Sequence, residues 1–223
     1  MTDLDELIPD VDIPNGTSGD WKVERYDVDI VTASISRMRD GNRYCPAGRY
    51  TRLVCGSDVV MSDTRAEKRD HLRFVRAAKG KVLINGLGLG MALGAVLRKK
   101  KDEDKDGYDG HLVTEVTVIE KSEDVIKLVA DNYTSDPRVT VINADAFEWK
   151  APRGSRWDCV WHDIWNDICT DNLPEMKRLH RKYGGRCNWQ MSWCRDICEM
   201  EMARDQELKR RIRRLSRLSL ASY

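Results

Sequence analysis

Three glycines at alternate positions follow a short apolar run, and this stretch constrains the fold more than any other. Residues 82–97 read VLINGLGLGMALGAVL, and the three glycines are Gly86, Gly88 and Gly90. A short continuous apolar run is typical of a strand that is buried on both faces of a parallel sheet. The stretch therefore predicts a buried strand, a tight glycine turn and then a helix.

Strands and helices alternate along the chain after this point. Such alternation predicts a parallel sheet with helices over both faces, and we count five strands, with no clear sixth or seventh before the C-terminal helix. The highly charged stretch 99–110 is typical of a surface loop. The expected strands are KVLIN, VTEVTVIE, RVTVINAD, WDCVWHDIW and RCNWQMSW, which begin at residues 81, 113, 138, 157 and 186.

The composition divides the chain into four expected parts. Residues 1–20 carry six acids and no lysine or arginine, which predicts a flexible acidic arm. Residues 21–62 are rich in Val, Ile, Thr and Tyr and contain turn residues, so we expect a small β-rich region of two or more antiparallel strands. Residues 63–195 would form the parallel-sheet domain, and residues 196–223 a long basic helix.

The overall charge excludes little and the cysteines suggest no metal. Lys and Arg number 38 against 37 Asp and Glu, so a net charge of +1 gives no general argument for a nucleic acid or membrane partner. The chain holds no apolar run of 18 residues and starts without a signal-type segment. Seven cysteines without a CxxC pair indicate reduced thiols in a cytoplasm and no metal site.

Acidic residues end the strands that follow the glycine turn. Glu120 could accept hydrogen bonds from both hydroxyls of a ribose, or it could simply be an acid at a helix start. Asp145, beside the backbone of Ala146, could accept an adenine amino proton. Asp163 ends the next strand at the same sheet edge. Because Met91 stands where a dinucleotide fingerprint needs its last glycine, the pattern favours another nucleoside-like ligand over NAD or FAD.

These motifs in this order resemble a known superfamily. VLINGLGLG, VTVIEKS, INADAFEW and WDCVWHDIW are similar to the motifs of class I S-adenosylmethionine-dependent methyltransferases, and more closely to the spermidine synthase-like branch. The resemblance covers residues 21–195. It implies an α/β, Rossmann-like parallel-sheet methyltransferase fold with a small N-terminal β-hairpin region, here with a long C-terminal helix.

The resemblance also implies roles for particular residues. The three glycines would contact the methionine part of S-adenosylmethionine, while Glu120 would hold the ribose and Asp145 the adenine amino group. Asp163 would be the catalytic residue, as a base or as a group that orients an amine. The full expected cofactor site is Asn85, Gly86, Gly88, Gly90, Glu120, Lys121, Asp145 and Ala146.

Two departures from the spermidine synthase pattern direct the expected reaction. Leu89 stands where those enzymes have the aspartate of their glycine loop, and Asn166 replaces the second aspartate of their fourth-strand motif. Both changes count against aminopropyl transfer. The resemblance therefore implies a methyltransferase that acts on a small molecule. A non-catalytic S-adenosylmethionine-binding or partner protein is the alternative, and an aminopropyltransferase ranks below both.

The aromatic residues and one histidine near the expected site remain to be interpreted. Trp161, Trp165, Trp189 and Trp193 could form an aromatic wall for a cationic acceptor, or they could belong to the core. His162 should point to the sheet face opposite Asp163, as a structural histidine.

The basic C-terminal run KRRIRRLSRL offers a contact to a nucleic acid or an acidic partner, or it is a solvated helix face. Because relatives in the spermidine synthase branch are often oligomers, we also expect a homodimer.

Overall fold

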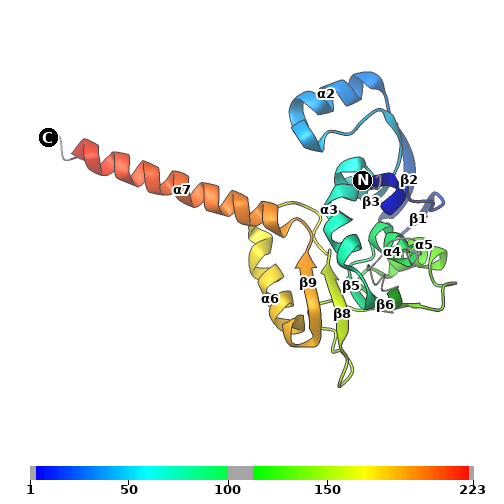
Figure 1. Ribbon diagram of the computed structural model, residues 1–223. Coiled ribbons are helices and arrows are strands. Elements are labelled where there is room, and N and C mark those ends of the chain that lie inside the picture. Colours follow the sequence, from blue (N-terminus) through cyan, green and yellow to red (C-terminus); the bar gives the residue numbers. More distant parts are fainter. Residues whose placement is uncertain (1–3, 100–112, 221–223) are drawn as a thin grey trace, which may run out of the picture.

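The computed structural model describes residues 4–99 and 113–220, and the side chains up to residue 213. Almost all of the charged stretch 99–110 lies outside the described residues. The chain folds into a four-stranded antiparallel sheet followed by a five-stranded parallel sheet with helices around it (Figure 1).

The parallel sheet contains the five expected strands and confirms the α/β fold. Its strand order is β7-β6-β5-β8-β9, and every neighbouring pair is parallel. The strand that precedes the glycines is thus the central one, because later strands are added on both of its sides. The strands are β5 (Gly80–Asn85), β6 (Val113–Glu120), β7 (Val139–Asn143), β8 (Trp157–His162) and β9 (Cys187–Ser192).

Helices cover both faces of this sheet, as a Rossmann-like fold requires. Alternate residues of β5 point to opposite faces. Val82 and Ile84 belong to the larger buried cluster, under three consecutive helices, whereas Leu83 packs with Leu179 and Tyr183 of α6. The helices are α3 (Arg65–Ala77), α4 (Met91–Leu97) and α5 (Glu123–Val129) on the first face, and α6 (Leu173–Tyr183) on the second.

The N-terminal sheet has the expected strands in residues 21–62, a further short strand from the segment that we expected to be a flexible arm, and a helix that the β-rich composition concealed. The strands are β1 (Gly16–Ser18), β2 (Trp21–Val28), β3 (Gly48–Cys55) and β4 (Asp58–Ser62). Between β2 and β3, IVTASISRMRD forms α2 (Ile30–Asp40), although we expected strand from its Ile, Val and Thr residues. Asp29 decides the outcome, because its carboxylate accepts from the Thr32 amide at 2.7 Å and caps the helix.

The acidic N-terminal segment is packed against the rest of the chain, which corrects the expectation of a flexible arm. After the short helix α1 (Leu4–Leu7), the side chains of Ile8 and Ile13 are fully buried in the main core. The buried ammonium of Lys68 on α3 bonds to Asp5 at 2.8 Å and to Asp10 at 2.5 Å. Composition missed this because the acids find their partner about 60 residues away.

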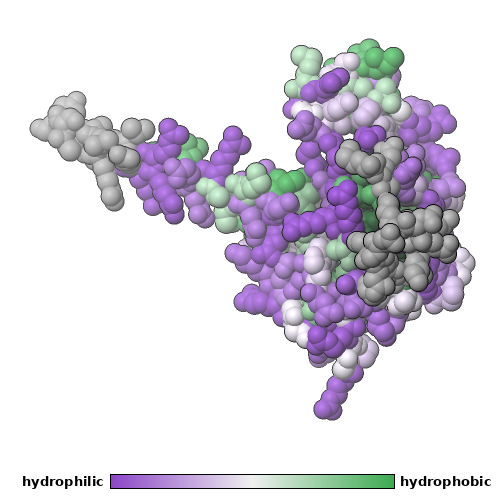
Figure 2. Space-filling view, viewed as in Figure 1, coloured by the Kyte–Doolittle hydropathy of each residue, from purple (hydrophilic) through white to green (hydrophobic). Residues whose placement is uncertain are grey.

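A long helix, α7 (Arg195–Leu220), runs away from the rest of the molecule (Figure 1). Its surface is mostly hydrophilic in Figure 2, with hydrophobic residues such as Leu208 and Ile212 half exposed between charged ones. Over the described residues, no helix has the length and apolar character needed to cross a bilayer. A nucleic acid contact through this helix stays a prediction, as does a homodimer.

Candidate functional site

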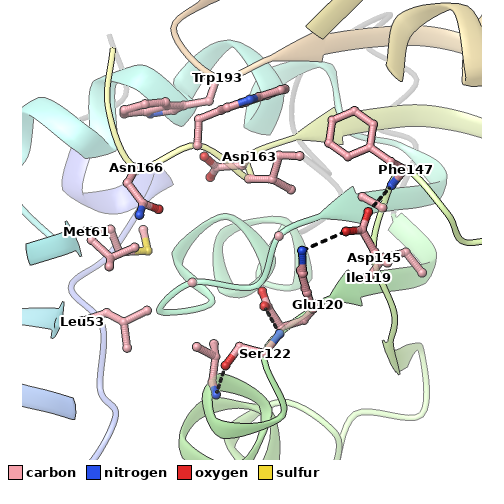
Figure 3. A pocket seen from close by; sticks show the side chains of 18 of the residues that line it. Leu53, Met61, Ile119, Glu120, Ser122, Asp145, Phe147, Asp163, Asn166 and Trp193 are labelled. Atoms are coloured by element: carbon pink, nitrogen blue, oxygen red, sulfur yellow. Dashed lines mark hydrogen bonds and ion pairs between the residues drawn. The ribbon is translucent and has the colours of Figure 1, made fainter. Parts of the chain in front are cut away.

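The carboxyl ends of four neighbouring parallel strands meet at one cavity of about 760 Å³ (Figure 3). Because these ends lie at the same sheet edge, residues far apart in the sequence come together there. Seven of the nine residues expected from the sequence line the cavity. They are Gly86, Gly88, Glu120, Lys121, Asp145, Ala146 and Asp163.

Glu120 ends β6 and is held rigidly by two backbone groups. One carboxylate oxygen accepts from the Leu87 amide in the glycine turn at 2.8 Å, and the other accepts from the Ser122 amide at 2.7 Å. Each oxygen keeps a further acceptor position, because a carboxylate offers about four in all. Glu120 therefore ties the glycine turn to the neighbouring strand and can still accept hydrogen bonds from a ligand in the cavity.

Asp145 lies just beyond β7 and is fixed in a similar way. It accepts from the Phe147 amide at 2.7 Å, and Lys121 lies 3.1 Å from its other oxygen. Burial acts to raise the pKa of Asp145, but the Phe147 amide and the Lys121 ammonium outweigh it and hold the pKa below its usual range. The carboxylate thus stays ionised beside the half-buried Phe147, and Lys121 serves as its counter-charge.

The three glycines make room for other parts of the same chain. A Cβ on Gly86, where φ is 100°, would lie 1.9 Å from the carbonyl oxygen of Asp163. At Gly88 it would lie 2.2 Å from the sulfur of Met61, and at Gly90 it would lie 2.3 Å from the ring of Tyr133. The pattern thus has an internal packing cause at every position, in addition to the place of the first two glycines on the cavity wall.

Two residues of the expected site do not line the cavity. Gly90 lies under Tyr133, and Asn85 is fully buried with its side-chain amide 2.8 Å from Nδ1 of His162. His162 also lies 3.3 Å from Gln190, and burial lowers its pKa to about 3. The expected cofactor role of the Asn85 side chain is therefore corrected, while His162 is the structural histidine that we expected.

Asp163 follows β8 and closes the edge above Gly86. Its amide donates to the Asn85 carbonyl at 2.7 Å, which brings its backbone onto the glycine turn. Its side chain is 19% exposed, and Oδ2 lies 3.7 Å from Nε2 of His71. Burial raises the pKa of Asp163, an effect that the charge on His71 partly offsets. Asp163 therefore presents a carboxyl group with raised proton affinity to the cavity.

The opposite side of the cavity comes from residues that the sequence reasoning missed. Met61 of β4 lies across the cavity from Glu120 and Asp145 (Figure 3), and Glu67 and His71 of α3 also line it. A signal for the last two was present. They lie at helical spacing from the buried Phe74 and Val75 along α3, so they are polar residues that continue an apolar stripe.

The four tryptophans divide between the two interpretations. Trp161 is fully buried and stacks on Phe74 with ring centres 5.1 Å apart, and Trp189 packs against the same core. Trp165 and Trp193 line the cavity. In the described ranges 4–99 and 113–213, no group of three or more Cys, His, Asp or Glu side chains is placed to hold a metal ion.

Comparison with known proteins gives only distant likenesses. No protein-family model and no curated protein sequence matches the chain. Among solved structures, the CcbJ methyltransferase from Streptomyces caelestis is 18% identical over 53% of this chain and 44% of its own, with a TM-score of 0.39. The YcgJ protein from Bacillus subtilis is 14% identical over 51% and 44%, with a TM-score of 0.36.

The plantazolicin methyltransferase BpumL, solved with SAH, is 15% identical over 52% of this chain and 38% of its own, with a TM-score of 0.34. The matched part makes up between 34% and 54% of the solved chains. At this level the likenesses decide nothing about activity. The functional argument rests on the cavity itself.

Proposed function

We propose that the cavity binds S-adenosylmethionine and that the protein transfers its methyl group to a small molecule. The observation that carries the proposal is the position of Glu120. It ends the strand next to the glycine turn, is locked by two backbone amides and retains acceptor positions toward the cavity. An acceptor at this place in a Rossmann-like sheet suits the two hydroxyls of a ribose.

The other cavity residues fit an adenosyl ligand as well. Asp145 supplies an ionised acceptor near the next strand end, and Phe147 and Ala146 supply apolar surface beside it. A volume of about 760 Å³ lies inside the ordinary range for small-molecule sites. Glu120 would hold the ribose, Asp145 the adenine amino group, and the turn at Gly86 and Gly88 the amino-acid part.

The chain's own task in this reaction is to position the acceptor and accept a proton. S-adenosylmethionine, when bound, supplies a methyl group that is already activated by its sulfonium. Positioning alone can then account for much of the rate. Asp163, above Gly86, contacts the acceptor, and its raised pKa suits it to hold the proton that the acceptor releases.

Calorimetric titration with S-adenosylmethionine, its decarboxylated form and S-adenosylhomocysteine tests the proposal. We expect both carboxylated compounds to bind, and Glu120→Ala to weaken them by about 100-fold, as the loss of two charged hydrogen bonds implies. The matched control is Glu123→Ala, which removes an exposed carboxylate three residues away. Absence of binding by the wild-type chain would refute the proposal.

The same titration separates the alternatives. A preference for the decarboxylated form would favour aminopropyl transfer. Binding without transfer of a labelled methyl group to any component of a small-molecule extract would favour a protein that only binds the cofactor. The buried Leu89, whose side chain belongs to the core rather than to the cavity, supplies no acid for the decarboxylated compound.

A further inference from the structure

A second cavity lies beside the first, where α6 meets the start of α7. It is a groove of about 650 Å³, and the two helices that form it lie side by side in Figure 1. Five residues line this groove: Pro174, Lys177, His180, Arg181 and Arg195. Three of these side chains are cationic at neutral pH and none of the five is acidic, so the groove has the charge of an anion site.

Two of the three cations have no counter-charge. Lys177 and Arg181 are exposed and lie one helical turn apart on α6, where like charges repel. Within residues 4–99 and 113–213, neither side chain makes a hydrogen bond or an ion pair. By contrast, Arg178, the neighbour of Lys177, pairs with Glu148 at 3.1 Å. An anion in the groove would replace the repulsion between Lys177 and Arg181 with an attraction to both.

The third cation, Arg195, is held in place by two partners. Its Nε donates to Glu199 at 2.8 Å and its Nη1 donates to Nδ1 of His180 at 2.7 Å. Burial, with the charge on Arg195 as a second cause, lowers the pKa of His180 to about 4. The ring is therefore neutral and can accept this hydrogen bond. No described residue bonds to Nη2 of Arg195, which leaves its two protons for a ligand.

Two short connections join the groove to the cavity of the proposed methyl transfer. Pro174 lines the groove, and the next residue, Glu175, lines the cavity. Trp193 lines the cavity, and Arg195, two residues later, lines the groove. Since consecutive Cα atoms are about 3.8 Å apart, the two sites share a border. Nε1 of Trp165 donates to Glu175 at 2.8 Å across this border, so a small molecule can reach from one site to the other.

We propose that the groove binds the phosphate group of the methyl acceptor, whose other end lies in the cavity near Asp163. The anion site is argued from the groove itself, whereas its link to the acceptor rests on the proposed function. The planar fork of a guanidinium suits the oxygens of a phosphate, and the two further cations match its second negative charge. A carboxylate carries one charge and would leave part of the groove unmatched.

The charges along α7 favour a compact phosphate ester over a nucleic acid. Residues 196–207, which follow directly after the groove, hold five acids and one arginine. The basic run of the helix starts only at Lys209. A phosphate backbone that continued from the groove along α7 would meet the acidic stretch first, and its repulsion opposes binding. The groove is therefore a local site for one phosphate group.

The test uses the full chain and three probes that carry the same butyl group: n-butyl phosphate, pentanoate and 1-butanol. Calorimetric titration without any cofactor should show that butyl phosphate binds about tenfold more tightly than pentanoate and that 1-butanol does not bind. No binding of butyl phosphate would overturn the anion site, and equal affinity for pentanoate would overturn its assignment to phosphate. Tighter binding of a ten-nucleotide single strand would overturn the choice of a small acceptor.

Substitutions locate the site. We expect Lys177→Gln and Arg181→Gln each to lower the affinity for butyl phosphate about tenfold, the effect of one lost charged contact. The matched control is Arg153→Gln, which removes an exposed cation from the loop before β8, and it should leave the affinity unchanged. Wild-type affinity in both groove variants would overturn the proposal, as would an equal loss in the control.

NMR tests the link to the cavity. Inorganic phosphate should shift the Nε–H signal of Arg195 and leave the indole N–H of Trp165 in place, whereas butyl phosphate should shift both. A shift of Arg195 alone with butyl phosphate would overturn the link to the acceptor. Binding of S-adenosylhomocysteine should persist in Lys177→Gln and Arg181→Gln. Its absence in the wild-type chain would count against the proposed function alone, because groove binding is measured without a cofactor.

Discussion

The two walls of the cavity are built in different ways. The sheet wall, which comprises Gly86, Glu120, Asp145 and Asp163, follows from short strand-to-loop connections, and backbone amides close to the strand ends fix the carboxylates of Glu120 and Asp145. The helix wall, which comprises Met61, Glu67 and His71, arises where the N-terminal sheet and α3 pack onto the parallel sheet. The sheet wall therefore holds two of its carboxylates rigidly through backbone amides, while the helix wall places polar side chains, among them the buried His71, beside the cavity.

The largest expected effect comes from crowding the sheet wall. Gly86→Ala places a methyl group against the backbone of Asp163 at a φ of 100°, and neither can move without breaking the strand end. We expect a loss of about 3 kcal/mol or more in the free energy of unfolding, measured by urea denaturation. Gly185→Ala, where nothing lies within 4 Å, should cost less than about 0.5 kcal/mol. Equal costs would mean that the close approach is absent.

Removal of a carboxylate from the sheet wall should come next. Glu120→Ala deletes two hydrogen bonds from backbone amides to a charged group, so we expect a loss of about 2 kcal/mol in stability without any ligand. Glu123→Ala removes only an exposed ion pair with Lys127 and should cost well under about 1 kcal/mol. If chemical denaturation gave the same result for both, Glu120 would not anchor the glycine turn.

The helix wall should make the free energy of unfolding fall as the pH rises. An acid that is paired with a cation has the opposite effect. Glu67 in the folded chain holds its proton up to about pH 8, whereas the unfolded chain releases it near 4.5. Its contribution is therefore complete below about pH 4.5 and is lost as the pH rises toward 8. Between pH 6 and 7 we expect this to lower stability by about 1 kcal/mol, and at most about 1.4.

Glu67→Gln keeps the acceptor oxygen for Ser62 but cannot ionise. The difference in unfolding free energy between this variant and the wild-type chain should grow in favour of the variant from pH 5 to pH 8 and then level off. A constant difference across this range, measured by thermal or urea denaturation, would show that Glu67 ionises at its ordinary pKa.

The smallest effect concerns the contact between the two walls. Met61→Leu retains most of the volume but removes the sulfur that accepts from the Leu89 amide at 3.0 Å, so we expect a cost of about 0.5–1 kcal/mol. Met200→Leu, on the exposed surface of α7, should cost nothing measurable. In a Met61→Ala background, Gly88→Ala should cost less unfolding free energy, because the added methyl group then meets empty space. An unchanged cost would show that Met61 and Gly88 are not coupled.

The sheet wall could be predicted from the sequence because its causes are local. An apolar strand, a turn and an acid are adjacent in the chain, and parallel strands place all such ends at one edge. The reason why glycine is required at these three positions could not be predicted from the sequence in the same way. Asp163, Met61 and Tyr133, which occupy the space over them, come from three distant segments.

The helix wall and the N-terminal segment escaped prediction for the same physical reason. Glu67 and His71 would be ordinary surface residues of an isolated helix, and only the packing of β4 and the β8 loop over α3 buries them. The acids at the start of the chain suggested disorder because their partner, Lys68, is invisible to composition. The strand prediction for residues 30–40 was wrong because one capping carboxylate, Asp29, outweighs the strand preference of Ile, Val and Thr.

The anchoring of Lys68 has a consequence for any shortened version of the chain. Its side chain is 3% exposed, and the carboxylates of Asp5 and Asp10 hold its ammonium group, one residue along α3 from Glu67. A protease cut or cloning boundary after residue 10 would leave every cavity-lining residue in the chain, yet it would leave the buried Lys68 cation without its two carboxylate partners. The first ten residues therefore supply the counter-charges that the buried lysine of α3 needs.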